Sequence, residues 1–437
     1  GVSPSVNPEP LALFFDAIFI GEIPEANDEQ GFLDVLAKIW GEKGVRRSGD
    51  RSRLAELRDE PGIYLPEAYH FSFREQGPIA QVEAAPFHPF PVKAVKRMNP
   101  AGTVPAALVD DPAAVFDAAL LMEINRGCGR GCRFCSSGWI HRPVRHCSFQ
   151  QFLSHICPED VKGRTVGLIG SDLAGHPELM EILSYLLSLG AKFSLSSIRP
   201  EGLTHELISM LRATGQKTVT LAPETASLRM KKIIGKTIPE ELFFEKINLL
   251  VSNGIPNIRL YFMVGLPSET DDDVLALVDF VLKAREVFVD ASRPLKRIGT
   301  MGVQLNPFVP KPWTPFQCVG MQPPKVIEKK LNIVRKGLGN TPNVRVRAES
   351  VREAVMQGLF SRADRRIAGS MYESVVRSIN LSRLLKSVGW YLDFFLYRER
   401  NWDELFPWDV VDHGIDKTVL RRVFENALPS ETKVSGG

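Results

Sequence analysis

Three of the six cysteines in this chain lie within eight residues, in the segment Cys128-Gly-Arg-Gly-Cys132-Arg-Phe-Cys135. The glycines between the thiols favour a loop over a packed core, because glycine adopts backbone conformations that other residues avoid. Three thiolates on one short loop can bind a single metal centre together. The other cysteines are too scattered to indicate a disulfide scaffold or an auxiliary cluster: Cys147, Cys157 and Cys318.

The loop allows two kinds of metal site. A structural zinc site needs four ligands, and Cys147, His141 or His146 could supply the fourth. A [4Fe–4S] cluster held by three cysteines instead leaves one iron open to a substrate or cofactor. A non-catalytic binding module stabilised by zinc or by a cluster is therefore the alternative to an enzyme.

Short apolar runs alternate with amphipathic helical patterns from the cysteine loop onward. The pattern at 176–189 places its leucines on one face and stops at Gly190. A capping box is expected at 237–240, and 270–273 should open another helix with acidic residues at the positive end of its dipole. The alternation predicts an α/β fold with a parallel sheet. The predicted strands are 120–124, 166–169, 193–196, 218–222, 258–264 and 301–305.

With Phe134 before its last cysteine, the loop resembles the signature of the radical S-adenosylmethionine (SAM) superfamily, of the type with an N-terminal cobalamin-binding domain. The resemblance implies that Cys128, Cys132 and Cys135 hold a [4Fe–4S] cluster and that SAM chelates its open iron. It implies reductive cleavage of SAM to a 5′-deoxyadenosyl radical, with methyl transfer to an unknown substrate as the first hypothesis. An electron donor of the flavodoxin or ferredoxin type and sensitivity to oxygen follow. The six units match the partial (β/α)6 TIM-like barrel of this superfamily, whose functional loops follow the strands.

Segments after the predicted strands resemble the SAM contacts of the superfamily. Ser171 and Asp172 stand where the family places a Gly-Gly-Glu-Pro segment, after the second strand. Ser197 and Arg199 follow the third strand, and an arginine there can pair with the SAM carboxylate in a bidentate manner. The resemblance thus assigns the following residues to SAM: Phe134 beside the adenine, Ser171, Asp172, Ser197, Arg199, Glu224 after the fourth strand, and Gly265 after the fifth.

The flanks are expected to form three further parts. Residues 1–30 resemble the end of a cobalamin-binding α/β domain, but the Asp-x-His-x-x-Gly cobalamin loop is absent, because no histidine precedes His70. Cobalamin is therefore suggested by kinship while its binding loop is missing from this sequence. Residues 31–118 should be a connector that packs on the barrel at 119–340, and 341–437 a mostly helical accessory segment.

A proline-rich segment follows the sixth strand. Its Pro-Lys-Pro-Trp-Thr-Pro-Phe run resembles a segment at the barrel mouth of cobalamin-type radical SAM proteins. The prolines fix an extended loop, and Lys311 and Trp313 are its chemical groups. Substrate contact and simple loop rigidity are equally good interpretations of these two residues, since loops at strand ends carry function.

Charge and hydropathy indicate no nucleic-acid or membrane partner. Lys+Arg exceeds Asp+Glu by 54 − 51 = 3, and no apolar run approaches the ~18 residues of a spanning helix. The first ten residues lack the features of a signal peptide, so we expect a cytoplasmic protein. A tRNA methylthiotransferase-like, RNA-modifying enzyme is a further alternative. It is disfavoured because such proteins carry cysteines before the loop, whereas the first cysteine here is Cys128.

Overall fold

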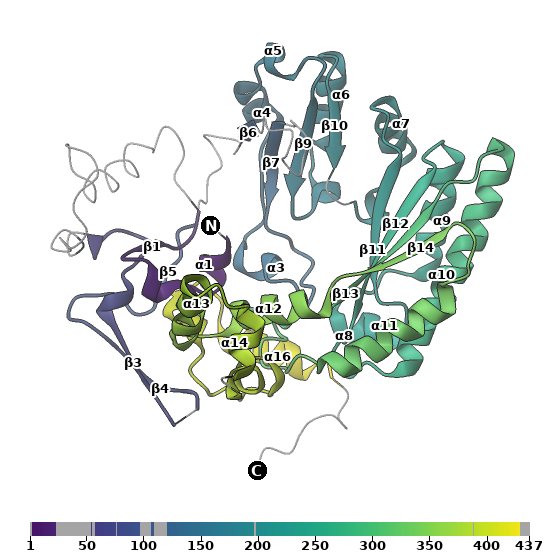
Figure 1. Cartoon of the computed structure of the whole chain (residues 1–437). Helices are drawn as coiled ribbons and strands as arrows, with labels where there is room; N and C mark the ends of the chain where they lie inside the picture. Colours follow the sequence, from purple (N-terminus) through teal and green to yellow (C-terminus); the bar gives the residue numbers. More distant parts are fainter. Residues whose placement is uncertain are drawn as a thin grey trace.

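Two sheets form the core of the chain in the computed structural model, the first parallel except for β6 and β8, which pair antiparallel with β7, and the second fully parallel (Figure 1). The structure describes residues 2–22, 54, 57–75, 77–96, 106–108, 120–195, 198–387 and 389–428. The first sheet has the order β10-β9-β7-β6, with β8 paired to β7, and the second has the order β11-β12-β13-β14. Their bounds are β6 Ala106–Leu108, β7 Leu120–Arg126, β8 Arg145–His146, β9 Thr165–Gly170, β10 Lys192–Leu195, β11 Thr218–Glu224, β12 Asn257–Val264, β13 Met301–Pro307 and β14 Val344–Ala348.

The six predicted strands are confirmed as β7, β9, β10, β11, β12 and β13, which follow one another in chain order as in a partial TIM-like barrel. Within the described residues β10 does not pair with β11, so the barrel is divided into two sheets. The end of the third predicted strand, Ser196, lies outside the described residues. β14 is a seventh parallel strand that the sequence analysis missed, because residues beyond 340 were expected to be helical.

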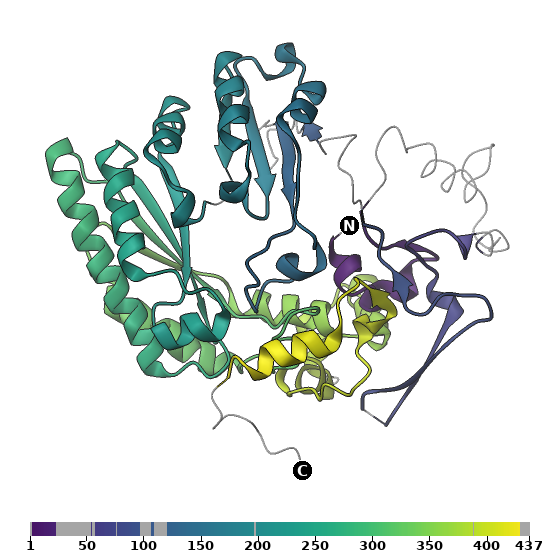
Figure 2. The ribbon, with the colours of Figure 1, turned by 180° about the vertical axis from the view of Figure 1, so that it is seen from behind.

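Helices cover the outer sides of both sheets (Figures 1 and 2). The helix predicted to open at 270–273 is confirmed as α10, with three acidic residues in its first turn, and it begins with a capping box: the Thr270 side chain accepts from the Asp273 N–H, and the Thr270 N–H donates to the Asp273 carboxylate (2.8 Å). The capping box predicted at 237–240 is wrong, because the helix begins at Glu240 behind Pro239 without a side-chain cap. The helices of this region are α3 Ser137–Ile140, α4 Phe149–His155, α5 Pro158–Val161, α6 Leu179–Ser188, α7 His205–Ala213, α8 Leu228–Ile234, α9 Glu240–Ser252, α10 Asp271–Ser292 and α11 Pro324–Leu338.

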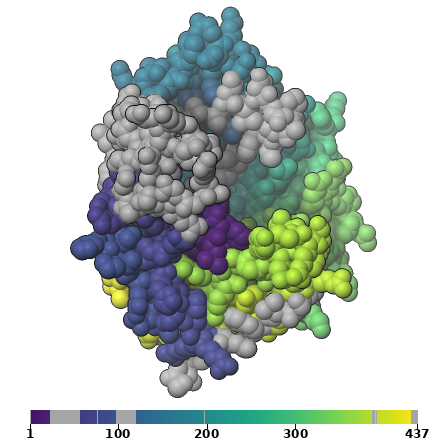
Figure 3. All heavy atoms as spheres, turned by 60° about the vertical axis from the view of Figure 1, so that its left-hand side comes forward, coloured from purple at the N-terminus to yellow at the C-terminus, as the bar shows by residue number. Residues whose placement is uncertain are grey.

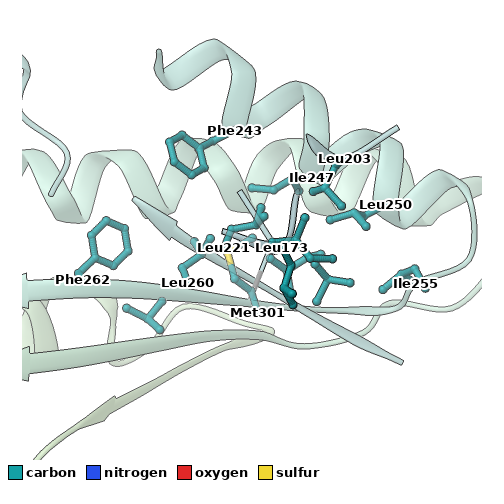
Figure 4. Close-up of a cluster of buried hydrophobic side chains, with 14 of the residues drawn as sticks. Leu173, Leu203, Leu221, Phe243, Ile247, Leu250, Ile255, Leu260, Phe262 and Met301 are labelled. Atoms are coloured by element: carbon teal, nitrogen blue, oxygen red, sulfur yellow. The ribbon is translucent and has the colours of Figure 1, made fainter. Parts of the chain in front are cut away.

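The hydrophobic core lies between the strands and these helices (Figure 4). Leu221 of β11 and Leu260 of β12 are fully buried and belong to the same cluster as Ile247 and Leu250 of α9. Successive residues of a strand point to opposite faces, so one face of the second sheet is apolar and the other is more polar. Among the described residues, no helix has both the length and the apolar character needed to cross a bilayer.

The N-terminal and C-terminal segments pack on each other (Figure 3, purple and blue beside yellow-green). The Glu9 carboxylate, which is fully buried, pairs with Arg365 at 2.8 Å, and the Asn7 amide donates to the Ala363 carbonyl (2.8 Å). A short parallel pairing of β5 with β15 adds to this contact. The N-terminal elements are α1 Val2–Val6, η1 Glu9–Phe14, β1 Ile18–Phe19, β2 Ile63–Tyr64, β3 Tyr69–Phe73, β4 Ile79–Ala84 and β5 Val92–Lys93. The C-terminal elements are α12 Val351–Arg362, α13 Ala368–Val376, α14 Leu381–Ser387, α15 Trp390–Leu392, β15 Val411–Asp412 and α16 Lys417–Glu425.

Candidate active site

The cysteine loop begins where β7 ends, and its backbone is closely packed. Gly127 has a φ of +83°, and a Cβ there would lie 2.4 Å from the His141 carbonyl oxygen, so only glycine fits. Gly131 has a φ of +73°. The Cys135 N–H then donates to the Cys132 carbonyl at 3.3 Å. The loop folds back on itself and leaves all three of its thiols partly exposed.

Arg133 fixes this loop to the end of α8. Its backbone N–H donates to the Ile234 carbonyl at 2.9 Å, and its guanidinium donates to the Ile233 carbonyl at 3.0 Å and to that of Lys232. The last carbonyls of a helix have no partner within the helix, so Arg133 supplies donors that they need. The cysteine loop of the first sheet is therefore joined to the second sheet.

The cysteine thiols lie in a mixed electrostatic environment. Burial raises the pKa of Cys132 and of Cys135 above the ordinary value. Lys236 and Arg199 act in the opposite direction on the pKa of Cys132, and the Gly138 N–H does so on that of Cys135. Because metal binding needs thiolates, cations beside the loop favour the loaded form.

The donor set suits a cluster better than a single ion. Within the part of the chain that the structure describes, no three His, Cys, Asp or Glu side chains form a group that could hold one metal ion. In a [4Fe–4S] cluster each cysteine binds a different iron, so the three thiols need not meet around one point. Three partly exposed thiols with cations beside them fit such a cluster.

The residues considered as a fourth zinc ligand have other partners. The Cys147 thiol is buried and donates to the next carbonyl oxygen at 3.4 Å. The His146 ring packs edge-on against His176, with centroids 5.0 Å apart. His141 Nδ1 lies 3.8 Å from a carboxylate oxygen of Glu22. None of these contacts directs a fourth ligand to the loop.

Ser171 and Asp172, predicted to meet SAM, lie against the cysteine loop. Asp172 Oδ2 accepts from Arg130 Nε at 3.1 Å, and the Asp172 N–H donates to the Asn125 amide oxygen at 2.8 Å. The Ser171 hydroxyl lies 3.1 Å from that of Ser137. The second carboxylate oxygen, Asp172 Oδ1, is buried and has no partner among the described residues. A buried acceptor without a donor is costly, which indicates a ligand group at this position.

Arg199 presents the complementary feature. One of its terminal nitrogens donates to the Glu201 carboxylate at 3.0 Å. Its Nε is buried and has no acceptor among the residues described. The predicted SAM contact Ser197 lies outside the described residues.

Glu224 ends β11 in an unusual backbone conformation. Its φ is +67°, a region that costs a non-glycine residue about 1 kcal/mol or more. Its carboxylate accepts from Lys236 Nζ at 2.9 Å, and both side chains are mostly buried. Sequence reasoning missed Lys236, although a lysine directly after the helix-ending glycine Gly235 was a visible signal.

Gly265 and Phe134 are held by neighbouring packing. Gly265 has a φ of +90°, and its N–H donates to the Glu269 carboxylate at 2.6 Å. Glu269 is in turn paired with Lys330 at 3.0 Å, and these two side chains are only 3% and 4% exposed. The Phe134 ring packs, partly buried, against the apolar cluster around Phe316.

The two candidate substrate residues of the proline-rich loop, Lys311 and Trp313, have different surroundings. The Ser136 hydroxyl donates to the Pro312 carbonyl at 3.1 Å, so the proline-rich loop contacts the end of the cysteine loop. Burial lowers the pKa of Lys311 to about 8, partly opposed by Glu349. Trp313 is 7% exposed, and its indole N–H donates to the Val6 carbonyl at 3.0 Å. We therefore assign Trp313 to packing and keep Lys311 as the candidate.

The lowered pKa of Lys311 gives a pH-dependent stability. The folded protein releases this proton near pH 8, whereas the unfolded chain keeps it to about 10.5. Stability should therefore rise between pH 8 and 10.5 in the wild type relative to Lys311→Met, by roughly 2–3 kcal/mol. Urea unfolding of both proteins at pH 7.5, 9 and 10 measures this difference. A constant difference across the range would contradict a desolvated amine.

The chain has relatives among proteins of known sequence. Residues 122–281 match the family model of the radical SAM superfamily. The chain is 30% identical over 256 residues to the uncharacterized protein MJ0966 of Methanocaldococcus jannaschii, covering 58% of this chain and 54% of that protein. It is 29% identical over 174 residues to the ribosomal protein uS12 methylthiotransferase RimO of Clostridioides difficile, covering 37% and 39%. The chain thus spans about half the length, or less, of these relatives.

Solved structures also resemble the chain. The radical SAM methyltransferase TsrM from Kitasatospora setae, with cobalamin and a [4Fe–4S] cluster bound, matches with a TM-score of 0.43 and 14% identity, over 74% of this chain and 60% of TsrM. Coproporphyrinogen III oxidase HemN from Escherichia coli matches with a TM-score of 0.37 and 16% identity, over 50% and 51%.

Proposed function

Because the chain belongs to the radical SAM superfamily over residues 122–281, we propose that it is an iron–sulfur enzyme that cleaves SAM reductively to a 5′-deoxyadenosyl radical. Cys128, Cys132 and Cys135 hold the [4Fe–4S] cluster. When bound, that cluster supplies the electron that breaks the carbon–sulfur bond of SAM. A small electron-transfer protein of the flavodoxin or ferredoxin type is the proposed donor.

One observation carries the proposal: the loop is bordered by a buried acceptor, Asp172 Oδ1, and a buried donor, Arg199 Nε, neither of which has a partner in the described part of the chain. The amino acid part of SAM offers an ammonium group and a carboxylate, which need one acceptor and one donor. Asp172 is thus suited to the ammonium and Arg199 to the carboxylate. Glu224, oriented by Lys236, supports the rest of the molecule with Phe134 and Gly265.

We propose methyl transfer as the first specific reaction, on the resemblance of the N-terminal residues to a cobalamin-binding domain. A cobalamin-dependent reaction would then need a cobalamin-binding loop that this sequence does not contain. Methylthio transfer is the second candidate, and the identity to RimO supports it. The group added to the substrate, methyl or methylthio, separates the two by mass spectrometry.

The deciding experiment is 5′-deoxyadenosine formation from SAM after anaerobic reconstitution with iron and sulfide and reduction with dithionite. The proposal expects 5′-deoxyadenosine and methionine in equal amounts. A fully loaded cluster without SAM cleavage would support a structural cluster instead. Zinc without iron in the purified protein would favour the zinc-stabilised binding module.

The two unpartnered atoms predict the SAM affinity of variants. Arg199→Met should weaken SAM binding by about 10- to 100-fold, because a hydrogen bond to a charged group contributes about 1.5–3 kcal/mol. Asp172→Leu should have a similar effect through the ammonium. Equilibrium dialysis with the reconstituted protein measures both. Arg421→Gln, at an exposed arginine of α16, is the control and should bind SAM like the wild type.

A further inference from the structure

Among the described residues, three arginines without a hydrogen-bond or ion-pair partner lie on the polar face of the second sheet. The helices α9, α10 and α11 cover the other face of this sheet (Figure 1). Arg259 is on β12, and Arg345 and Arg347 are on β14. All three side chains are exposed. Within the residues described, none of them makes a hydrogen bond or an ion pair. Unpaired cations gathered on one face need an explanation, since like charges repel each other.

The strand register brings the three arginines around one glycine. Gly302 of β13 is paired with Arg259 on one side and with Arg345 on the other. Gln304, two residues on, is paired with Arg347. A Cβ on Gly302 would make only ordinary contacts, with Arg259 Cγ at 3.8 Å as the nearest atom, so the space directly beside Gly302 is open.

The arginines line a cavity of about 260 Å³. No aspartate or glutamate of the described residues lines this cavity. Its other polar side chains are uncharged and belong to Thr218, Asn257, Thr300 and Gln304. The inner face of a closed (β/α) barrel is normally filled by branched apolar side chains. This face is therefore built as a cationic, hydrogen-bonding surface and not as a packed core.

We propose that this arginine face binds an oxyanion of the substrate, a phosphate or carboxylate group. Guanidinium groups bind such oxygens with paired, charge-assisted hydrogen bonds. This inference rests on the proposed function, because it concerns the substrate of the proposed SAM-cleaving enzyme. Across the second sheet, Ala348, Leu305, Phe262 and Glu224 are paired in one row. Arg347 is the residue directly before Ala348 in β14. The cavity lining includes Thr218, the first residue of β11, and Glu224 is the last residue of that strand, so a substrate whose anion is held here would extend along the strands toward Glu224.

The test is binding of inorganic tripolyphosphate and of citrate to the anaerobically reconstituted protein by calorimetry, with saturating SAM and at low salt. We expect at least one of these anions to bind, and more weakly as salt is added. The double variant Arg345→Gln/Arg347→Gln should lose binding at least 10-fold. Gly302→Leu should do the same by filling the cavity, without backbone strain because Gly302 does not have a positive φ. Arg293→Gln, at an arginine that is 73% exposed outside this face, should bind like the wild type.

The two anions distinguish the source of the oxyanion. Preference for tripolyphosphate points to a phosphorylated substrate, and preference for citrate points to a polycarboxylate. Absence of binding by both anions, or equal binding by the wild type and the double variant, overturns the inference. SAM cleavage is measured on the same preparations, so a failure of the radical chemistry is seen separately from a failure of anion binding.

Discussion

Alanine at Cys128, Cys132 or Cys135 is expected to reduce 5′-deoxyadenosine formation to the level without enzyme. Each thiol binds a different iron, so two cysteines cannot hold the cluster in the geometry that leaves only one iron open. Iron content and the visible absorption of the reconstituted variants should fall with the activity. The measurement is 5′-deoxyadenosine by chromatography together with iron per chain.

A matched control is available at Cys157, which is exposed and donates to the nearby Glu159 carboxylate at 3.0 Å. Cys157→Ala makes the same chemical change away from the loop and should keep both the iron content and the activity. Retention of a full cluster with all three loop cysteines replaced would show that the cluster, and the proposed chemistry with it, belongs elsewhere.

Lys330→Met is expected to destabilise the protein by about 3–5 kcal/mol. Lys330 donates to the backbone carbonyl of Glu269 at 2.8 Å and pairs with its carboxylate, and both side chains are almost fully buried. Burial raises the pKa of Glu269, and Lys330 opposes that rise. Removal of the lysine leaves a buried carboxylate without its cation, so the loss should increase with pH as Glu269 ionises. The free energy of unfolding in urea at pH 5 and pH 8 measures this.

Two further variants distinguish the loss of the buried Glu269–Lys330 ion pair from a general effect of changing a lysine in α11. Lys329→Met changes the neighbouring lysine of α11, which is 65% exposed and pairs with Asp271, and should cost no more than about 1 kcal/mol. Glu269→Gln combined with Lys330→Met removes both charges and should recover most of the stability. Equal losses for the Lys329 and Lys330 variants would contradict the importance of the buried pair. Because Glu269 also accepts the Gly265 N–H, the Lys330 variant should weaken SAM binding as well.

The sheet strands could be predicted because each is a short apolar run between helical patterns. Their apolar positions, such as Leu221 and Leu260, are the ones that become fully buried. β14 escaped prediction because its sequence alternates valine with arginine, and it reads as a surface segment until its partner β13 is known. The division between β10 and β11 depends on long-range packing that no local pattern encodes.

The candidate site could be predicted where a motif names the residue, as for the three cysteines. Arg133 and Lys236 were missed, because their roles depend on α8 docking on the cysteine loop. For Trp313 the sequence left substrate contact and loop rigidity open, because its partner Val6 is distant in the sequence. Residue type and spacing indicate chemistry, but they do not show which side chains packing has already engaged.

The pairing of Glu9 with Arg365 has a consequence for the order of folding during synthesis. The N-terminal segment is synthesised before its partners, because Ala363 follows Asn7 by 356 residues and His413 follows Ser5 by 408 residues. The strands and helices from β7 to α11 make mostly contacts with sequence neighbours and can form earlier. The apolar side chains of the N-terminal segment therefore remain exposed to solvent until their C-terminal partners have been synthesised. We expect chaperone binding during synthesis to concentrate on these side chains.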